Sequence, residues 1–152
     1  MTYTAQYCEE NIYLLAKSFC SEEGDHRQSY AVFISNVSRN VALFNQQASQ
    51  APQLPVLWDY HVLLLTVESR QTPNDDLTVS IWDYDTRLGF PCPFDVYMIG
   101  TFPDIISDIS ASCGLDLVSH FRVVPTSDFL DHFASDRSHM VYCFSRPCCC
   151  SL

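Results

Sequence analysis

The stretch of sequence that decides the fold is an apolar run near the middle of the chain, Val56-Leu57-Trp58-Asp59-Tyr60-His61-Val62-Leu63-Leu64-Leu65-Thr66-Val67. Most of its residues are β-branched, aromatic or leucine, a composition typical of a β-strand. Three successive leucines, residues 63–65, interrupt the alternation of apolar and polar side chains that a strand with one exposed face shows. We therefore expect a strand that is covered on both faces and lies at the centre of a sheet.

A second strand is expected directly after this run. Residues 71–76 contain the turn formers Pro73, Asn74 and Asp75, and residues 77–84 again have the composition of a strand. A turn of this kind between two apolar runs predicts that the two strands pair antiparallel.

Further strands are expected on either side of this pair in the sequence. Residues 30–34 form a compact β-rich run and residues 36–40 have the composition of a turn. Residues 41–44 are then expected to pair back on residues 30–34 as a hairpin. Later in the chain, residues 121–124 are expected to form another strand.

One helix is expected near the start of the chain. The apolar residues of 9–19 fall on one helical face. Glu9 and Glu10 would lie in the first turn, where carboxylates interact favourably with the positive end of the helix dipole. The helix should therefore begin at Cys8 or directly after it.

Two shorter helices are expected in the second half of the chain. Phe94, Tyr97 and Met98 have the spacing of a short helix that packs on the sheet. Ser127 is expected to cap a helix that ends near residue 133 and has Asp128 in its first turn.

These elements together predict the α+β class, with an antiparallel sheet and flanking helices. A chain of 152 residues is long enough to bury one core, so we expect a single domain of residues 1–140. Residues 141–152 show no period and include three consecutive cysteines, residues 148–150, so we expect them to form a disordered tail.

The charge balance excludes several kinds of partner. Eight Lys and Arg residues stand against 18 Asp and Glu, and the net charge of -10 repels phosphate backbones and anionic lipid surfaces. We therefore expect neither nucleic acid nor membrane as a partner. An acidic surface favours cationic ligands such as a peptide α-amine, although it also serves solubility.

The eight cysteines are expected to be reduced thiols in a cytoplasmic or nuclear protein. Residues 1–10 lack the basic and apolar regions of a signal peptide, and disulfides are uncommon inside cells. The cysteines in the body of the chain form no CxxC pair, so the spacing typical of structural zinc sites is missing and no metal is expected.

Cys8 is a candidate nucleophile because of its expected place at a helix N-terminus. Unpaired backbone N–H groups and the helix dipole lower a thiol pKa at such a position and favour the reactive thiolate. A free cysteine is also commonly a small buried hydrophobic residue, and position alone leaves both interpretations open for Cys8.

His61 and Asp83 are candidates for the base and its orienting carboxylate. Strand alternation would place Asp59, His61 and Leu63 on one face, and Asp83 on the same face as Asp85. A carboxylate that accepts a hydrogen bond from a histidine holds its tautomer and stabilises the imidazolium. Hydrogen-bonded structural histidines and ordinary turn carboxylates are the alternative interpretation.

Five segments spread over residues 7–140 resemble one known family. They are Tyr7-Cys8-Glu9-Glu10-Asn11-Ile12, Tyr30-Ala31-Val32-Phe33-Ile34-Ser35-Asn36, Trp58-Asp59-Tyr60-His61-Val62, Phe90-Pro91-Cys92 and Phe133-Ala134-Ser135-Asp136-Arg137-Ser138-His139-Met140. On these segments the chain resembles the protein N-terminal glutamine amidohydrolases. The resemblance implies a core similar to that of papain and the transglutaminases, with a Cys-His-Asp triad at Cys8, His61 and Asp83.

The resemblance also implies a reaction. It is the hydrolysis of the side-chain amide of an N-terminal glutamine, through a thioester, to give N-terminal glutamate and ammonia in the N-degron pathway. The expected partners are proteins or peptides with N-terminal glutamine, no cofactor is expected, and the protein is expected to be a monomer. Asp59 and Asp85 are candidates for binding the substrate α-ammonium. The alternative for both residues is a purely structural role.

One departure from the family pattern leaves alternatives open. Family members continue beyond residue 140 with a proline-rich stretch and an aromatic region, whereas residues 141–152 stand in their place here. The chain is therefore identified as a truncated or divergent member. The alternatives are a truncated relative without catalytic activity, and another cysteine-dependent acyl-transfer enzyme such as a peptidase or a transglutaminase-like protein.

Overall fold

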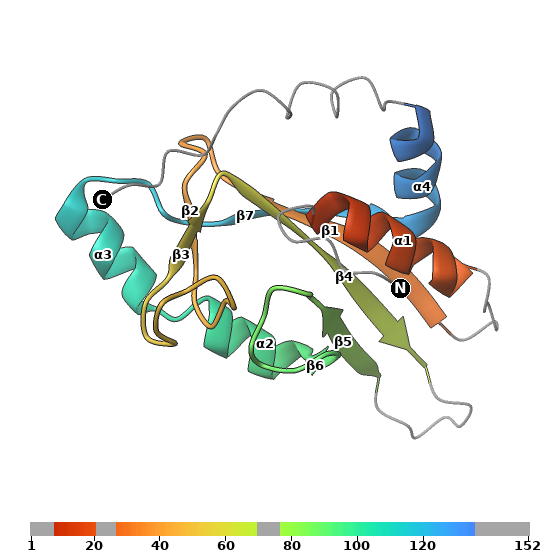
Figure 1. The fold of residues 1–152 in the computed structure, drawn as a ribbon, viewed down its shortest axis with the longest axis horizontal. Helices are drawn as coiled ribbons and strands as arrows, with labels where there is room; N and C mark the ends of the chain where they lie inside the picture. Colours follow the sequence, from red (N-terminus) through yellow and green to blue (C-terminus); the bar gives the residue numbers. More distant parts are fainter. Residues whose placement is uncertain (1–7, 21–26, 70–76, 136–152) are drawn as a thin grey trace.

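The computed structural model describes residues 8–20, 27–69 and 77–135 (Figure 1). Along the chain the elements are α1 (Cys8–Cys20), β1 (Arg27–Ser35), β2 (Val41–Leu43), β3 (Val56–Trp58), β4 (Tyr60–Glu68), β5 (Thr78–Trp82), β6 (Cys92–Pro93), α2 (Phe94–Thr101), α3 (Ile105–Cys113), β7 (His120–Pro125) and α4 (Thr126–Ser135).

The main sheet has the strand order β6-β5-β4-β1-β7, and every neighbouring pair is antiparallel. The strand that contains the three leucines, β4, is therefore the central one, as the sequence predicts. Its register pairs Leu63 with Val32 of β1 and Leu64 with Trp82 of β5. The predicted α+β class with an antiparallel sheet and flanking helices is confirmed.

Helices cover both faces of this sheet, which explains the unbroken apolar run in β4. On one face, Leu64 and Val62 pack against Ile12 of α1 and Phe129 of α4, and Figure 1 shows these two helices on the same side. On the other face, Leu63 packs in a cluster with Tyr97 of α2. Because successive side chains of a strand point to opposite faces, an apolar residue is needed at every position of such a strand.

The predicted hairpin between residues 30–34 and 41–44 is wrong. Strand β2 pairs with β3 in a separate two-stranded sheet, with Val41 opposite Trp58. The reason is that β4 occupies one edge of β1 and β7 occupies the other, so β1 has no edge left for β2. The side chains of Val41 and Leu43 instead fill the core between the two sheets.

The apolar run 56–67 contains two strands instead of one. Asp59 lies at a bend between β3 and β4, and its Oδ1 accepts a hydrogen bond of 3.0 Å from the backbone N–H of Tyr60. An aspartate that bonds its own neighbouring backbone offers the chain an alternative to the strand ladder, so it ends one strand before the next begins. The alternation that would place Asp59 on the face of His61 therefore does not apply.

The helices follow the sequence expectations with one correction. Helix α1 begins at Cys8, and α2 packs against the sheet. Helix α4 begins at Thr126, so Ser127 lies inside its first turn and is not its cap. Helix α3, which no sequence pattern predicted, ends at Cys113, and the residue that follows it as C-cap, Gly114, has a φ of 68°. The expected tail, residues 141–152, lies outside the described residues.

No described helix combines the length and the apolar character that a membrane span requires.

Candidate active site

A buried histidine–aspartate pair lies between the two adjacent strands that the sequence singles out. His61 is the second residue of β4, and Asp83 directly follows β5. His61 Nε2 lies 2.9 Å from Asp83 Oδ1, and the two side chains are 0% and 1% exposed. The antiparallel pairing of β4 with β5 brings the two residues together, although 22 positions separate them in the sequence.

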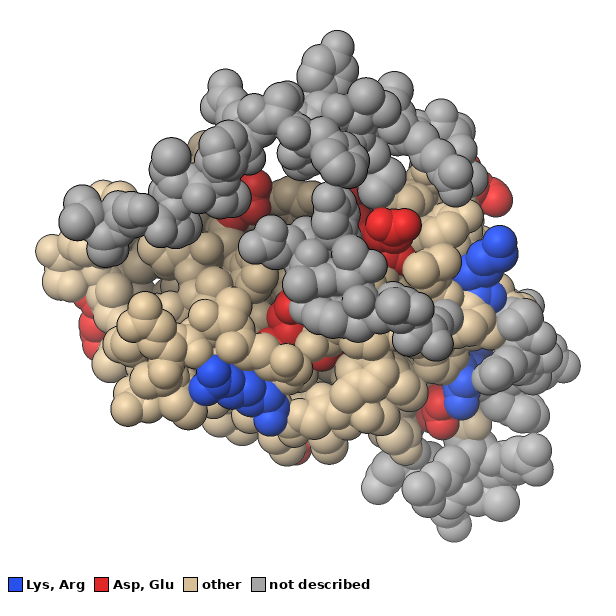
Figure 2. Space-filling model, viewed as in Figure 1, with Lys and Arg blue, Asp and Glu red and all other residues tan. Residues whose placement is uncertain are grey.

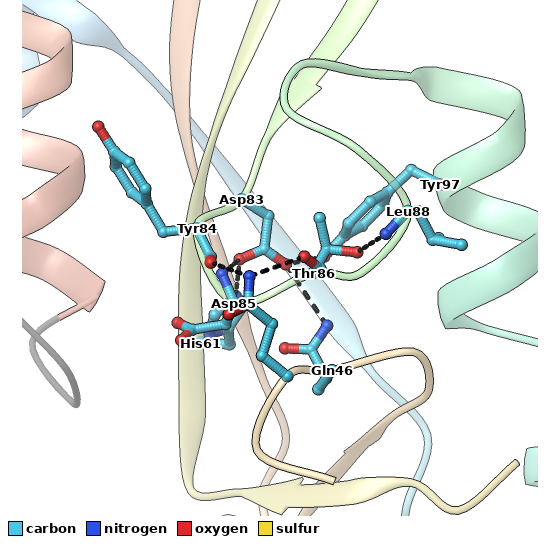
Figure 3. Close-up of polar contacts among 9 residues, drawn as sticks. Gln46, His61, Asp83, Tyr84, Asp85, Thr86, Leu88 and Tyr97 are labelled. Carbon is cyan, nitrogen blue, oxygen red and sulfur yellow. Dashed lines mark hydrogen bonds and ion pairs between the residues drawn. The ribbon is translucent and has the colours of Figure 1, made fainter. Parts of the chain in front are cut away.

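The Asp83 carboxylate accepts hydrogen bonds on both oxygens (Figure 3). Oδ1 accepts from His61 and from the backbone N–H of Asp85 at 2.9 Å. Oδ2 accepts from the Tyr97 hydroxyl at 2.7 Å and from Gln46 Nε2 at 3.4 Å. Burial raises the pKa of Asp83, but the charge of His61 and the hydrogen bonds from His61, Tyr97 and the Asp85 backbone outweigh it, so the pKa lies below its ordinary value.

His61 carries a proton across the neutral pH range. Burial lowers its pKa, but the charge of Asp83 and the hydrogen bond with Asp83 raise it, and an interaction with Cys8 adds to the same direction. The resulting pKa is about 10. Because Nε2 bonds Asp83, the interaction with Cys8 is left to Nδ1, which forms no other hydrogen bond among the described residues.

Cys8, the first residue of α1, lies beside this pair. Its half-buried side chain packs against the apolar cluster under α1 and interacts with His61. At this position the positive end of the helix dipole lies beside the thiol and favours negative charge there. The structure thus brings Cys8, His61 and Asp83 into one site.

The two candidates for binding the substrate amine are placed differently. Asp85 is 7% exposed, and ligand-type atoms of His61, Asp83 and Asp85 all lie within 4.8 Å of one another. Asp59 is exposed, is bonded to its own backbone neighbour and is not part of this cluster. The cluster has the residue types of a metal site, but a metal ion on His61 Nε2 would replace the bond between His61 and Asp83.

Three further residues surround the pair, and the sequence did not predict them as site residues. The Trp58 ring lies 5.3 Å from the His61 ring, centroid to centroid. Tyr97 was expected only as part of a short helix that packs on the sheet, and Gln46 lies in a segment for which no role was predicted. No local pattern could show that the hydroxyl of Tyr97 and the amide of Gln46 meet Asp83, because they come from separate segments.

The loop that contains Gln46 is bonded to the turn after Asp83. The backbone N–H of Gln47 donates to the Asp85 carbonyl at 2.6 Å, and the N–H of Arg87 donates to the Asn45 carbonyl at 2.8 Å. Gln46 also forms a bridge with Thr86. These bonds fix the position of Asp85 relative to the histidine–aspartate pair.

The fold and the site together define a class: an α+β protein whose sheet carries a buried, protonated histidine–aspartate pair beside a cysteine at a helix N-terminus. Such a set of groups can supply a nucleophile, a proton donor and acceptor, and an orienting carboxylate.

The particular family follows from comparison with known proteins. The model of the family described as N-terminal glutamine amidase matches residues 3–147. The chain therefore belongs to this family, as the resemblance of its segments implies.

Relatives in this family come from plants and animals. The chain is 37% identical over 141 residues to a protein N-terminal glutamine amidohydrolase of Arabidopsis thaliana, with 91% of this chain and 60% of the relative covered. Its identity to the proteins of that name from Danio rerio and Homo sapiens is 40% over 139 residues, with 91% of this chain and 63% and 62% of the relatives covered. The chain thus spans about three fifths of the length of these curated relatives.

Proposed function

We propose that this protein hydrolyses the side-chain amide of an N-terminal glutamine, giving N-terminal glutamate and ammonia. Family membership supports the substrate class, because the relatives carry the name of this activity. The observation that carries the proposal is the buried bond of 2.9 Å between His61 and Asp83, with Cys8 beside the same histidine.

The first half of the reaction forms a thioester. With a pKa of about 10, His61 holds a proton at neutral pH, and its positive charge stabilises the Cys8 thiolate. The thiolate attacks the carboxamide carbon of the substrate, and the backbone N–H groups at the start of α1 stabilise the negative charge on the oxygen. His61 then donates its proton to the departing ammonia, which leaves the acyl group on sulfur.

The second half releases glutamate. His61, now neutral, accepts a proton from a water molecule that attacks the thioester carbon, and the C–S bond breaks to return the thiolate and the imidazolium. Asp83 stabilises the imidazolium in both halves and holds the ring in one orientation. No cofactor takes part in this scheme.

Recognition of the free α-ammonium is assigned to Asp85. Its position next to His61 and its low exposure place a carboxylate where water screens its charge little. On the described part of the face in Figure 2, acidic side chains lie at separate places and form no continuous patch. The acidic surface as a whole therefore does not explain how the α-ammonium would be recognised, and the assignment of Asp85 rests on its position in the site. The exposed Asp59 is the second candidate.

The test uses a peptide that begins with glutamine and the same peptide with an acetylated N-terminus. Ammonia release and a mass gain of about one dalton on the free-amine peptide alone are expected, and Cys8→Ala should abolish both because only sulfur forms the acyl intermediate. Deamidation of an internal glutamine would instead support a transglutaminase-like enzyme, and cleavage of the peptide bond would support a peptidase. Soluble, folded protein that changes neither peptide refutes the proposal.

A non-catalytic family member is the second candidate, and an apolar groove favours it. The groove has a volume of about 240 Å³ and lies on the face of the sheet between α2 and β7. Phe121 and Val123 of β7 line it and are 45% and 55% exposed. An exposed apolar surface of this kind favours association and can lower stability, which would reduce activity even with an intact site.

The remaining expectations belong to the same proposal. We propose a monomer in the cytoplasm or nucleus that acts in the N-degron pathway, with a core similar to that of papain and the transglutaminases. Sedimentation of the purified protein tests the monomeric state.

A further inference from the structure

Tyr97 reaches the histidine–aspartate pair from a separate element of the fold. It lies on α2, its side chain is fully buried, and its hydroxyl donates a hydrogen bond of 2.7 Å to Asp83 Oδ2. The other oxygen of the same carboxylate, Oδ1, bonds His61. Figure 3 shows Tyr97 and His61 on opposite sides of the Asp83 carboxylate.

The hydroxyl of Tyr97 is not required for packing. The ring lies in an apolar cluster that includes Val32, Leu63 and Ile81, and a phenylalanine ring would fill the same space. A hydroxyl in such a core costs free energy unless it has a partner, and its partner here is the charged carboxylate. Burial and the charge of Asp83 raise the pKa of Tyr97 well above its ordinary value, so the hydroxyl keeps its proton and remains a donor.

The carboxylate needs a bond on each oxygen to stay in one orientation. The terminal torsion of an aspartate is broad and only roughly two-fold, so the bonds to the oxygens decide the plane of the group. Oδ1 bonds His61 and the backbone of Asp85, and Oδ2 bonds Tyr97 and, at the longer distance of 3.4 Å, Gln46.

We propose that Tyr97 is a positioning residue for the amidase reaction, which it supports by fixing the Asp83 carboxylate toward His61, with Gln46 as a weaker second support. The effect of Tyr97 on the reaction rate rests on the proposed function. Its effect on the bond between His61 and Asp83 can be measured without any substrate.

The matched variants are Tyr97→Phe and Tyr30→Phe. Each removes one tyrosine hydroxyl, but the Tyr30 hydroxyl donates its hydrogen bond to the exposed Gln28 at 3.0 Å and does not reach the Asp83 carboxylate. Tyr97→Phe is expected to lower kcat on the N-terminal glutamine peptide ~10-fold, the usual effect of losing a hydrogen bond to a charged group, with KM unchanged. Tyr30→Phe is expected to leave kcat as in the wild type.

The second readout is a proton NMR resonance. The proton between His61 Nε2 and Asp83 is expected to give a strongly downfield signal in the wild type, since it is buried in a charge-assisted bond. In Tyr97→Phe this signal is expected to move upfield or disappear by exchange, whereas in Tyr30→Phe it should stay. Gln46→Met is expected to change the signal in the same direction to a smaller extent, and it serves as the test if Tyr97→Phe does not fold.

The outcomes separate this proposal from the proposed function. An unchanged downfield signal and unchanged kcat in folded Tyr97→Phe overturn the role of Tyr97, and so does an equal loss of kcat in Tyr30→Phe. If the wild type does not deamidate the peptide, the proposed function fails, and the NMR signal alone decides whether Tyr97 positions Asp83.

Discussion

The replacement Asp83→Asn tests the central feature of the site, the charge of the carboxylate beside His61. The side chain keeps its size, but the negative charge that holds the proton on His61 is removed. Only the smaller interaction with Cys8 then opposes the effect of burial, so the pKa of His61 should fall from about 10 to below the ordinary value of 6.5. His61 should become neutral at pH 7, and the proposed reaction, which needs the imidazolium, should slow by on the order of 10⁴-fold, the effect of the same replacement in a Ser-His-Asp triad.

The expected contribution of the pair to the free energy of unfolding follows from the same pKa of His61. A difference between about 10 in the folded protein and 6.5 in the unfolded chain corresponds to about 5 kcal/mol at 1.36 kcal/mol per pKa unit. Because the folded pKa is the higher one, this stabilisation is fully present below pH 6.5 and is lost as the pH rises through 10. At pH 9, one pH unit below the folded pKa, it should amount to only about 1 kcal/mol.

The assay is urea unfolding of the wild type and Asp83→Asn at pH 6 and pH 9. The wild type should be more stable than the variant by about 3–5 kcal/mol at pH 6, the usual cost of removing one partner of a buried ion pair, and the difference should shrink to about 1 kcal/mol at pH 9. Asp83 itself adds no change in this range, because its lowered pKa affects stability only at acidic pH. An equal difference at both pH values, or titration of His61 near 6.5 in the wild type, would refute the reasoning.

Three further predictions concern the fold. Leu64→Ala, at a fully buried position in the central strand, should cost about 2–5 kcal/mol in urea unfolding. Asn36→Ala removes three side-chain hydrogen bonds of 2.7–2.9 Å, two to Asn40 within the turn and one to the carbonyl of Asp116, and it should lower the unfolding free energy by about 1–3 kcal/mol without changing His61 titration. Phe121→Ser combined with Val123→Thr should reduce binding of an apolar fluorescent dye and any self-association in sedimentation, since both residues line the groove; unchanged dye binding would place the exposed apolar surface elsewhere.

The central strand was predictable because its signal is local. Three leucines in succession require cover on both faces, and the structure supplies α1 and α4 on one face and α2 on the other. The start of α1 at Cys8 was predictable for the same reason, since the two glutamates and the apolar face lie within the helix itself. Patterns of this kind depend only on neighbours along the chain.

The strand partners could not be predicted from local patterns. Residues 41–44 follow a turn and have strand composition, so a hairpin with β1 was the natural expectation. Both edges of β1 are instead taken by β4 and β7, and the latter lies about 90 residues later in the sequence. Which strand occupies an edge of β1 depends on the whole fold, so the composition of the residues near the turn cannot predict it.

The same limit applies to the candidate site. His61 and Asp83 could be paired from the sequence because they lie on or next to strands that follow one another in the chain, and a turn was predicted between those strands. Tyr97 and Gln46 could not be added, because they contact Asp83 from α2 and from the loop before β3. The local pattern therefore predicted the pair, whereas the groups that hold it depend on tertiary packing.

The placement of the three candidate catalytic residues follows from the geometry of the sheet. Cys8 packs with α1 on the face of Val62 and Leu64, whereas His61 shares the opposite face with Leu63. Groups on opposite faces can meet only at the end of a strand or at an edge of the sheet. The bend at Asp59 makes His61 the second residue of β4, and Cys8 is the first residue of α1, so both lie at the ends of their elements. The break in the apolar run therefore allows the sheet to bury the pair of His61 and Asp83 and still present the histidine to the cysteine.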